Sequence, residues 1–559
     1  MPEPLTPNAD RTARRLVARA PHLLILIAFA LWLSTLTQRS IWADELGTTS
    51  VMAQPDMTSV LKFVANEERR PPLYFALLYL WTGVAGQHEF ALRFFSLFFS
   101  TLSAATMFAL ARKMSTMFGS GGRALPLLAL SLTIVSPVLA LYGVMIRYYV
   151  LVLFLALMLN LIFVRWLYAA AKPPKAAGGE SLALWSTMVI ASMVYRYGSL
   201  ARLRANRQQT ILLWAWFAVG LLLIYTDYSI IALIGAQLVW LVVHRQDFER
   251  PARRWLAVFV ALALAYLPLL ASLLEQVGRS KMEADLSSQP LGLALKLVYP
   301  VFSFIYGETI LPWHWLVLVT FPLVAVAGLK ALRRIRFTPL IALALILAAL
   351  PLAFNIFILS TVATDLAFLT IASRTLFALP PFLMILTSAI MAMPARWRTL
   401  TVAALAVTNG AAWLNLVIGV EYHNPIYAVP LRSVTQSIER DLQPGDVIIA
   451  DLDTAFHYYW LQKPHEDSRF YFADELVSAE NYIQATRAPH TWLISFGRDR
   501  SRANDHTEEI RAWLAPAYDP IGEWGFAPVD AVYRAVKARL IGREVYAYKL
   551  VVSRFGRKS

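Results

Sequence analysis

Long apolar runs alternate with short polar segments along residues 21–420. Crossing a hydrocarbon core takes about 20 apolar residues, so each long run is expected to form a transmembrane helix. The expected helices are 21–38, 90–111, 124–142, 148–168, 210–226, 228–244, 255–274, 313–330, 338–360, 375–393 and 399–420. The pattern predicts a polytopic α-helical membrane protein with about eleven crossings. Residues 182–197 are apolar but short and are followed by arginines, so we place them on the cytoplasmic side of the membrane.

The composition excludes a soluble protein. Of the 559 residues, 58% are hydrophobic and only 16% are charged, whereas about a quarter of the residues in a soluble domain are charged. The net charge of +15 comes from bases that lie between apolar runs, which is typical of membrane topology and not of nucleic-acid binding. The chain has no cysteine, so disulfides, thiolate metal sites and cysteine nucleophiles are excluded.

The basic segments set the orientation. Starting from a cytoplasmic N-terminus, eleven crossings bring every basic segment to the cytoplasm: Arg11–Arg19, Arg112–Arg123, Lys172–Lys175, His244–Arg254, Lys330–Arg336 and Arg396–Arg398. The opposite face then carries the long loop 39–89, a turn at Arg147, the loop at Asp227, the loop 275–312 and everything after residue 420. We therefore expect a cytoplasmic tail (1–20), a membrane domain (21–420) and an outer domain (421–559).

The outer domain has a different pattern. A turn at 443–446 precedes a short buried strand at 447–450, and 491–496 reads as a second strand. Residues 508–514 are expected to form an amphipathic helix, and residues 544–553 a closing strand. Strands that alternate with helices predict a small α/β domain outside the cytoplasm.

The acidic pair Asp44-Glu45 is the first candidate for chemistry. It directly follows the first expected span and opens a loop that is too long for a simple connection. Carboxylates at a membrane boundary are costly and are functional candidates by default. The alternative is a solvated loop start.

Several cations are expected on the same outer face. Arg69 and Arg70 precede the stretch Pro71-Pro72-Leu73-Tyr74, and an arginine fork can donate two hydrogen bonds to one phosphate. The alternative there is a solvated charge run before an interfacial helix at 73–84.

Three further outer positions carry charge: Arg147 with Tyr148 and Tyr149, Asp227, and Arg374. Taken singly, Arg147 could snorkel to the interface beside belt tyrosines, and Asp227 could serve a tight turn. Together with the acidic pair they suit a reaction between a lipid-linked phosphate and a nucleophile.

Three strings carry a family resemblance: Trp42-Ala43-Asp44-Glu45, Arg70-Pro71-Pro72-Leu73-Tyr74 and the stretch 89–96 that contains Arg93. In their order and spacing the chain resembles the GT-C-type membrane glycosyltransferases, in the group of protein O-mannosyltransferases and aminoarabinose transferases. The resemblance continues weakly through 147–149 and 373–374 and does not extend to the C-terminal domain.

The resemblance implies transfer of a sugar from a polyprenyl-phosphate carrier to an acceptor hydroxyl on the outer face, with inversion at the anomeric carbon. Asp44 would then be the general base, and Glu45 would orient it or bind the acceptor. The donor phosphate would be held by a set of cations and tyrosines: Arg69, Arg70, Tyr74, Arg147, Tyr148 and Arg374. Asp227 and Arg93 would bind the acceptor or serve the structure.

The chain departs from the family pattern at two positions and leaves the cofactor open. Arg70 stands where relatives often have lysine, and Thr375 follows Arg374 where they often have tyrosine. A divalent cation helps several relatives, but no ligand spacing here demands one. His457 and His465 are expected on the surface of the outer domain.

Other classes are a lipid-linked glycan flippase or transporter, a non-catalytic envelope assembly or sensor protein, and a polymerase or ligase using a lipid-diphosphate oligosaccharide. A transporter favours repeated halves with charges at the midplane, which we do not find. The expected partners are the bilayer, a polyprenyl-phosphate sugar and an acceptor that is a lipid, a glycan or a protein, with no nucleic acid. The basic inner loops favour a bacterial inner membrane with the C-terminal domain in the periplasm.

Overall fold

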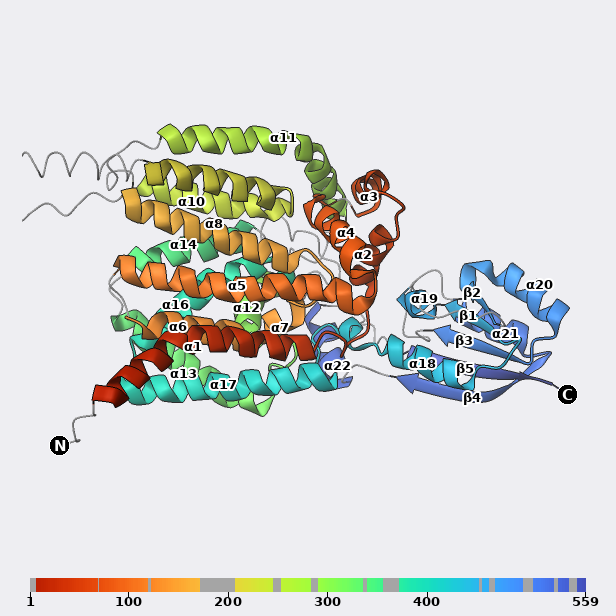
Figure 1. The fold of residues 1–559 in the computed structure, drawn as a ribbon. Helices are drawn as coiled ribbons and strands as arrows, with labels where there is room; N and C mark the ends of the chain where they lie inside the picture. Colours follow the sequence, from red (N-terminus) through yellow and green to blue (C-terminus); the bar gives the residue numbers. More distant parts are fainter. Residues whose placement is uncertain are drawn as a thin grey trace, which may run out of the picture.

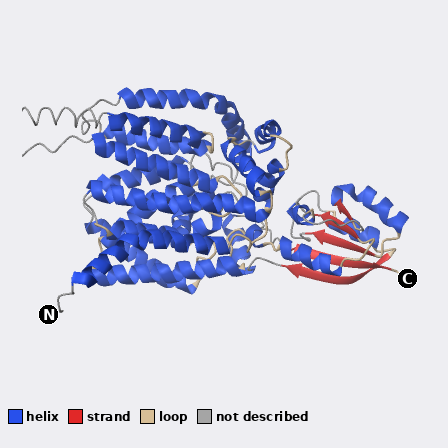
Figure 2. Ribbon diagram, in the orientation of Figure 1, coloured by secondary structure: helices blue, strands red, loops and turns tan. Residues whose placement is uncertain are grey.

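The chain forms a helical unit followed by a smaller α/β unit in the computed structural model (Figures 1 and 2). The structure describes the chain apart from residues 1–6, 69, 119–121, 171–206, 245–252, 283–289, 335–338, 355–370, 452–454, 462–467, 496–505, 527–530, 542–549 and 559. The segment 182–197 therefore lies outside the described residues.

Helices occupy the positions expected from the apolar runs. They are α1 (Pro7–Ser34), α5 (Glu89–Phe118), α6 (Ala124–Val135), α7 (Pro137–Tyr142), α8 (Tyr149–Ala170), a helix at Arg207–Ile224, α10 (Ile231–Val243), α11 (Arg253–Met282), α13 (Trp315–Arg334), α14 (Pro339–Phe354), α16 (Leu379–Met391) and α17 (Ala395–Ile418).

The expected helix 124–142 is divided into α6 and α7. Ser136 between them has an extended backbone. Its N–H donates to the Thr133 carbonyl at the end of α6, and its side chain accepts from the Leu139 N–H at the start of α7. Pro137 explains the break, because proline pushes the residue before it out of the helical region. The division lets α7 end beside the outer turn that carries Arg147.

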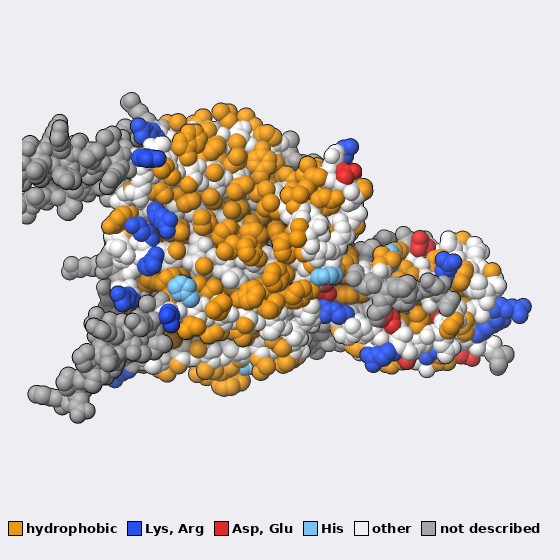
Figure 3. All heavy atoms as spheres, in the orientation of Figure 1, with side chains coloured by type: hydrophobic (Ala, Val, Ile, Leu, Met, Phe, Trp, Pro, Cys, Tyr) orange, Lys and Arg blue, Asp and Glu red, His pale blue; other side chains and the backbone are white. Residues whose placement is uncertain are grey.

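The surface of the helical unit is apolar, as a bilayer requires. Four described helices are long and apolar enough to cross a membrane: Glu89–Met117, Tyr149–Ala170, Arg207–Ile224 and Ala395–Ile418. Large exposed side chains include Leu26, Trp214, Leu264 and Val407. Hydrophobic atoms cover its visible side, and Lys and Arg gather at the end where the N-terminus lies (Figure 3). A soluble monomer rarely exposes such a continuous apolar face. The helical unit is a membrane unit, and the number of eleven crossings stays a prediction.

The loops that were predicted to lie outside contain helices of their own. The loop 39–89 holds α2 (Ala43–Met52), α3 (Met57–Phe63), the π-helical turn η1 (Val64–Glu68) and α4 (Leu73–Ala85). They lie at the end of the helical unit that faces the α/β unit (Figure 1). The expected loop 275–312 contains α12 (Pro290–Tyr306), and α15 (Ile371–Arg374) precedes η5 (Leu376–Ala378). The apolar run of α12 is shorter than a membrane span, which is why the sequence pattern placed it in a loop.

The second unit is built on one mixed sheet. Its strands are β1 (Val447–Asp451), β2 (Arg469–Phe472), β3 (His490–Ser495), β4 (Tyr518–Phe526) and β5 (Leu550–Arg557), in the order β2-β1-β3-β5-β4. β1 runs parallel to β2 and β3, whereas β5 runs antiparallel to β3 and β4. β1, β3 and the helix α21 (Thr507–Leu514) lie where they were predicted, whereas β2 and β4 were not predicted.

Helices cover both faces of this sheet. Val447 and Ile449 face a core shared with α20 (Leu476–Thr486) and α21. Ile448 belongs instead to the large core that continues into the helical unit, through α18 (Leu431–Asp441) and α19 (Ala455–Trp460). The unit is thus packed against one end of the membrane helices by its α18 and α19 face.

Candidate active site

The acidic pair opens α2. Trp42 precedes the helix with an extended backbone, so Asp44 and Glu45 fall in the first helical turn. Carboxylates are stabilised there by the positive end of the helix dipole. The pair lies at the end of the membrane helices that faces the second unit (Figure 1).

Glu45 is fully engaged. Its carboxylate accepts hydrogen bonds from Arg93 Nε (3.1 Å) and Arg93 Nη2 (2.7 Å), and its Oε1 also accepts from the backbone N–H of Ile146 (2.9 Å). Its side chain is 1% exposed. A carboxylate held by a forked arginine in a buried place anchors the structure, which favours the orienting role for Glu45 over direct contact with an acceptor.

Arg93, in the first turns of α5, contacts several segments at the end of the helical unit that carries the acidic pair. It donates to the carbonyl oxygens of Leu36 (2.7 Å), Arg39 (2.7 Å) and Ser40 (3.1 Å), and forms ion pairs with Glu45 and Glu89. With all these partners and 1% exposure, the surroundings of Arg93 favour the structural one of its two expected roles.

Asp44 is much less engaged than its neighbour. Its carboxylate accepts one long hydrogen bond, 3.5 Å from the hydroxyl of Tyr149 to Oδ2. The side chain is half-buried. Among the described contacts, Asp44 therefore retains acceptor capacity that a reacting hydroxyl could use.

Arg147 lies against Asp44. Its Nη1 donates to the Asp44 carbonyl (2.9 Å), to Thr48 Oγ1 (3.1 Å) and to Glu68 Oε2 (3.2 Å). Its Nε is buried and has no hydrogen-bond partner in the described structure. An unpaired buried donor is costly, and an anion bound beside it would satisfy it.

The charges around Arg147 keep it ionised. Burial by itself would lower the pKa of this guanidinium, but the negative groups nearby, Asp44 foremost, raise the pKa above its ordinary value. The side chain is therefore a permanent cation next to the candidate base.

Glu68, at the end of η1, reaches Arg147 because Gly47 leaves room for it. A Cβ added at Gly47 would overlap Glu68 Oε1. The absence of a side chain on this face of α2 therefore permits the Arg147–Glu68 pair.

Arg70 and Arg374 complete a group of cations around Tyr148. The Tyr148 ring lies 5.5 Å from the Arg70 guanidinium carbon and 5.7 Å from that of Arg147, both within cation–π range. The charges of Arg70, Arg147 and Arg374 all act on the Tyr148 phenol. Within the described part of the chain, neither Arg70 nor Arg374 has an ion-pair partner, so both guanidinium groups are available to a ligand.

Two of the expected residues have mainly structural surroundings. Asp227 caps the short 3₁₀ helix η2 (Tyr228–Ile230), where its Oδ1 accepts from the Ser229 N–H (2.6 Å) and hydroxyl. Its carboxylate also acts on Arg70. Burial by itself would lower the pKa of the Arg70 guanidinium, but Tyr148 and Asp227 raise it. Tyr74 is fully buried against the rings of Phe75 and Phe95.

Arg69 and His465 lie outside the described residues. His457 is half-buried rather than on the surface, stacked on Phe470 with ring centroids 4.8 Å apart. No group of three or more His, Asp or Glu side chains that could hold a metal ion occurs among the described residues. Participation of a divalent cation stays a prediction.

Two carboxylates in this region were missed from the sequence. Glu68 belongs to the charged string before Arg70, and that string was the available signal. Glu308 is buried and accepts hydrogen bonds from Tyr142 and from Ser303 (3.1 Å). Burial, together with the charges of Glu308 and Asp44, raises the pKa of the Tyr427 hydroxyl. In the sequence, Glu308 lies among apolar and aromatic residues, and no charged residue close to it indicated this placement.

The site brings together a carboxylate with spare acceptor capacity and three guanidinium groups at the boundary of a membrane unit. A carboxylate of this kind can take a proton from a hydroxyl. Positioned cations can stabilise an anion that develops on a leaving group. The arrangement thus suits transfer from a phosphate-bearing lipid.

Comparison with known proteins gives distant structural likenesses. No protein-family model matches the chain, and no curated protein sequence matches it significantly. Among solved structures, ArnT from Cupriavidus metallidurans is 13% identical over 95% of this chain and 97% of that one, with a TM-score of 0.47 without ligand and 0.46 when bound to undecaprenyl phosphate. An oligosaccharyltransferase from Archaeoglobus fulgidus is 11% identical over 90% of this chain and 72% of its own, with a TM-score of 0.41.

The mycobacterial arabinofuranosyltransferase AftD is 13% identical over 98% of this chain and 40% of its own, with a TM-score of 0.43. The oligosaccharyltransferase and AftD are sugar transferases by name, and the sequence resembles that class. The proposal below rests on the geometry of the site.

Proposed function

We propose that this protein is an inverting glycosyltransferase that moves a sugar from a polyprenyl-phosphate carrier to an acceptor hydroxyl at the outer face of a bacterial inner membrane. The observation that carries the proposal is the meeting of Asp44 with Arg70, Arg147 and Arg374 around Tyr148 and Tyr149. These residues come from three parts of the chain that are far apart: the loop 39–89, the turn at 147–149 and position 374.

In the proposed reaction, Asp44 takes the proton of the acceptor hydroxyl while the oxygen attacks the anomeric carbon. The bond from that carbon to the lipid phosphate breaks, and its electron pair leaves with the phosphate. Attack opposite the leaving group inverts the anomeric carbon. The guanidinium groups of Arg70, Arg147 and Arg374 stabilise the departing phosphate.

The half-buried setting of the site supports this assignment. Hydrogen bonds and ion pairs to a phosphate are stronger where the surroundings exclude water. Arg147 offers its unpaired Nε, and Arg70 and Arg374 offer forks free of carboxylate partners among the described residues.

The test is to incubate the purified protein with a panel of labelled polyprenyl-phosphate sugars and candidate acceptors, and to follow which label leaves the carrier. A transferase releases the lipid phosphate and moves the label to a hydroxyl. A flippase moves the intact labelled carrier between leaflets of a vesicle and leaves the sugar–phosphate bond whole. An assembly protein does neither, and either result would overturn the proposal.

A further inference from the structure

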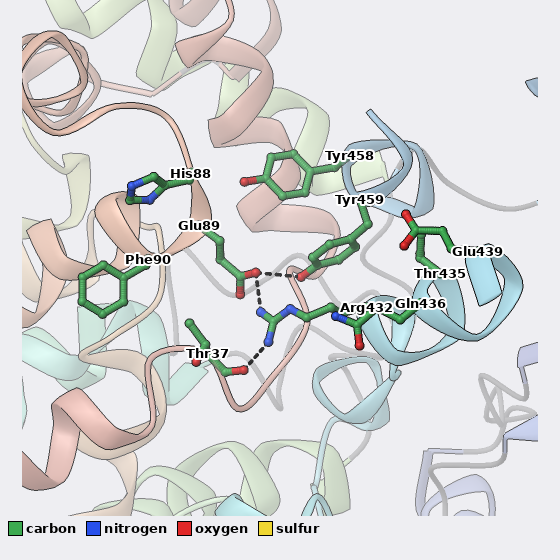
Figure 4. Close-up of a pocket in the computed structure, with 10 residues that line it drawn as sticks. All are labelled: Thr37, His88, Glu89, Phe90, Arg432, Thr435, Gln436, Glu439, Tyr458 and Tyr459. Atoms are coloured by element: carbon green, nitrogen blue, oxygen red, sulfur yellow. Dashed lines mark hydrogen bonds and ion pairs between the residues drawn. The ribbon is translucent and has the colours of Figure 1, made fainter. Parts of the chain in front are cut away.

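A cluster of charged side chains around Glu89 lies between the acidic pair and the C-terminal unit. It borders a cavity of about 390 Å³ whose lining includes Thr37, Glu89, Arg432 and Tyr459 (Figure 4). These residues come from the segment after α1, the start of α5, α18 and α19.

Glu89 is the group that both units share. One carboxylate oxygen, Oε1, forms an ion pair with Arg93 one helical turn further along α5. The other, Oε2, accepts from Arg432 of α18 and from the hydroxyl of Tyr459 of α19, the latter at 3.1 Å. Glu89 is buried, so these cations and the hydroxyl are its main stabilisation.

The C-terminal unit also holds the segment that leads into the acidic pair. The Ile41 N–H donates to the Tyr459 hydroxyl (2.6 Å), and the Arg432 N–H donates to Ser40 Oγ (3.0 Å). The Arg432 guanidinium donates to the carbonyls of Thr37 and Arg39. The segment 37–41 is therefore held by the C-terminal unit on one side.

Arg93 holds the same segment from the other side through the carbonyls of Arg39 and Ser40. Arg93 also divides its charge between Glu45 and Glu89. When Arg432 and Tyr459 compensate Glu89, Arg93 remains available to Glu45. Without them, a buried Glu89 would compete with Glu45 for Arg93, because a buried charge without a partner is strongly unfavourable.

We propose that Glu89 is a positioning residue, through which docking of the C-terminal unit fixes the acidic pair and with it Asp44. The catalytic consequence rests on the proposed function, whereas the mechanical coupling does not. The C-terminal unit is then a part of the active site and not an appended module.

The test uses the lack of cysteine in the chain. Ser50 is exposed on α2, so Ser50→Cys provides a single position for a spin label whose mobility reports on that helix. The label is read in the full-length protein and in two variants, Arg432→Met and Tyr459→Phe. The second variant keeps the ring and removes only the hydroxyl between Glu89 and Ile41.

The matched control is Arg511→Met. This change removes an ion pair with Glu523 (2.8 Å) inside the same C-terminal unit, away from Glu89. We expect the label on α2 to become more mobile in Arg432→Met and Tyr459→Phe and to stay unchanged in Arg511→Met.

In the transfer assay, the same two variants are expected to lower kcat by about tenfold or more at unchanged donor KM, because small misplacements of a reacting group are costly. Unchanged label mobility in both variants overturns the coupling, whatever the activity. Increased mobility in a protein that transfers no sugar supports the coupling and overturns the proposed function.

Discussion

At the scale of single residues, Asp44 and Glu45 differ in how fully their carboxylates are bonded. Successive residues of a helix point about 100° apart, so α2 directs one side chain into the fold and the other toward Tyr149. Glu45 meets Arg93 and the Ile146 N–H, whereas Asp44 meets one long hydroxyl contact. This asymmetry supports the proposal that Asp44 is the proton acceptor and Glu45 the anchor.

The anchoring role predicts a large loss of stability in Glu45→Ala. Glu45→Ala removes one of the two carboxylates that compensate the buried Arg93, and breaking a buried ion pair in this way costs about 3–5 kcal/mol. The change in unfolding free energy is measured by denaturant titration in detergent. Glu523→Ala, which removes an exposed partner of Arg511, serves as the control and costs about 1 kcal/mol or less. Equal losses in the two variants would contradict the anchoring role.

At this scale the sequence indicated most of the candidate residues but not the role of each one. Asp44, Arg70, Arg147 and Arg374 were singled out by residue type and predicted side of the membrane. In the structure Arg147 contacts Asp44, and Arg70 and Arg147 both lie over the Tyr148 ring. Which carboxylate of the pair is free depends on Arg93, whose contacts join residues about 50 positions apart. No local pattern encodes that pairing.

At the scale of elements, the site depends on the close approach of α2 to the π-helical turn η1. Gly47 and Glu68 meet there, and Glu68 then reaches Arg147. Glu68 is the last residue of this π-helical turn (Val64–Glu68), two positions before Arg70 in the chain.

This contact predicts that Gly47→Ala impairs transfer while the fold persists. The added methyl displaces the Glu68 carboxylate and weakens its pair with Arg147, and loss of one charge-assisted hydrogen bond of about 1.5 kcal/mol corresponds to about tenfold in kcat/KM. Gly83→Ala is the matched control, since a Cβ at Gly83 of α4 meets nothing within 4 Å. Steady-state transfer kinetics decide: equal kcat/KM in the two variants would show that the Glu68–Arg147 pair has no part in the reaction.

Elements were predictable where one apolar run makes one helix. The runs at 148–168 and 399–420 correspond closely to α8 and α17. The helices α2, α3 and α12 were not predicted, because they are short and take their stability from packing on neighbours rather than from a long apolar pattern. The break at Ser136 follows from Pro137 and could have been foreseen.

At the scale of the whole molecule, the predicted orientation places the acidic pair and the cytoplasmic loops at opposite ends of the helical unit. α5 connects them, with Glu89 in its first turn beside the acidic pair and Arg112 and Lys113 near its other end. A helix of this length, at 1.5 Å per residue, is long enough to span a bilayer.

Single cysteines test this orientation directly. Ser50→Cys on α2 and Thr116→Cys near the end of α5 both lie at exposed positions. We expect a membrane-impermeant thiol reagent to label Ser50→Cys in spheroplasts and to label Thr116→Cys only after lysis. The opposite pattern would place the site on the cytoplasmic side and contradict the orientation.

The α/β character of the C-terminal unit could be predicted from its strand and turn pattern, but its attachment could not. Arg432 and Tyr459 contact Glu89, about 340 to 370 positions earlier in the chain. Both residues look like ordinary surface side chains in the sequence. Only the packing of α18 and α19 on the membrane unit gives them a role.

The central claim is that Asp44 takes the acceptor proton in a site that binds a polyprenyl-phosphate sugar. Single-turnover transfer from a labelled donor, measured for the unmodified chain and for Asp44→Asn alongside donor binding, tests it most directly. The account predicts that Asp44→Asn slows transfer by about 10²–10⁴-fold while donor binding is kept, because the amide cannot accept the proton. Transfer at the normal rate in Asp44→Asn would contradict it.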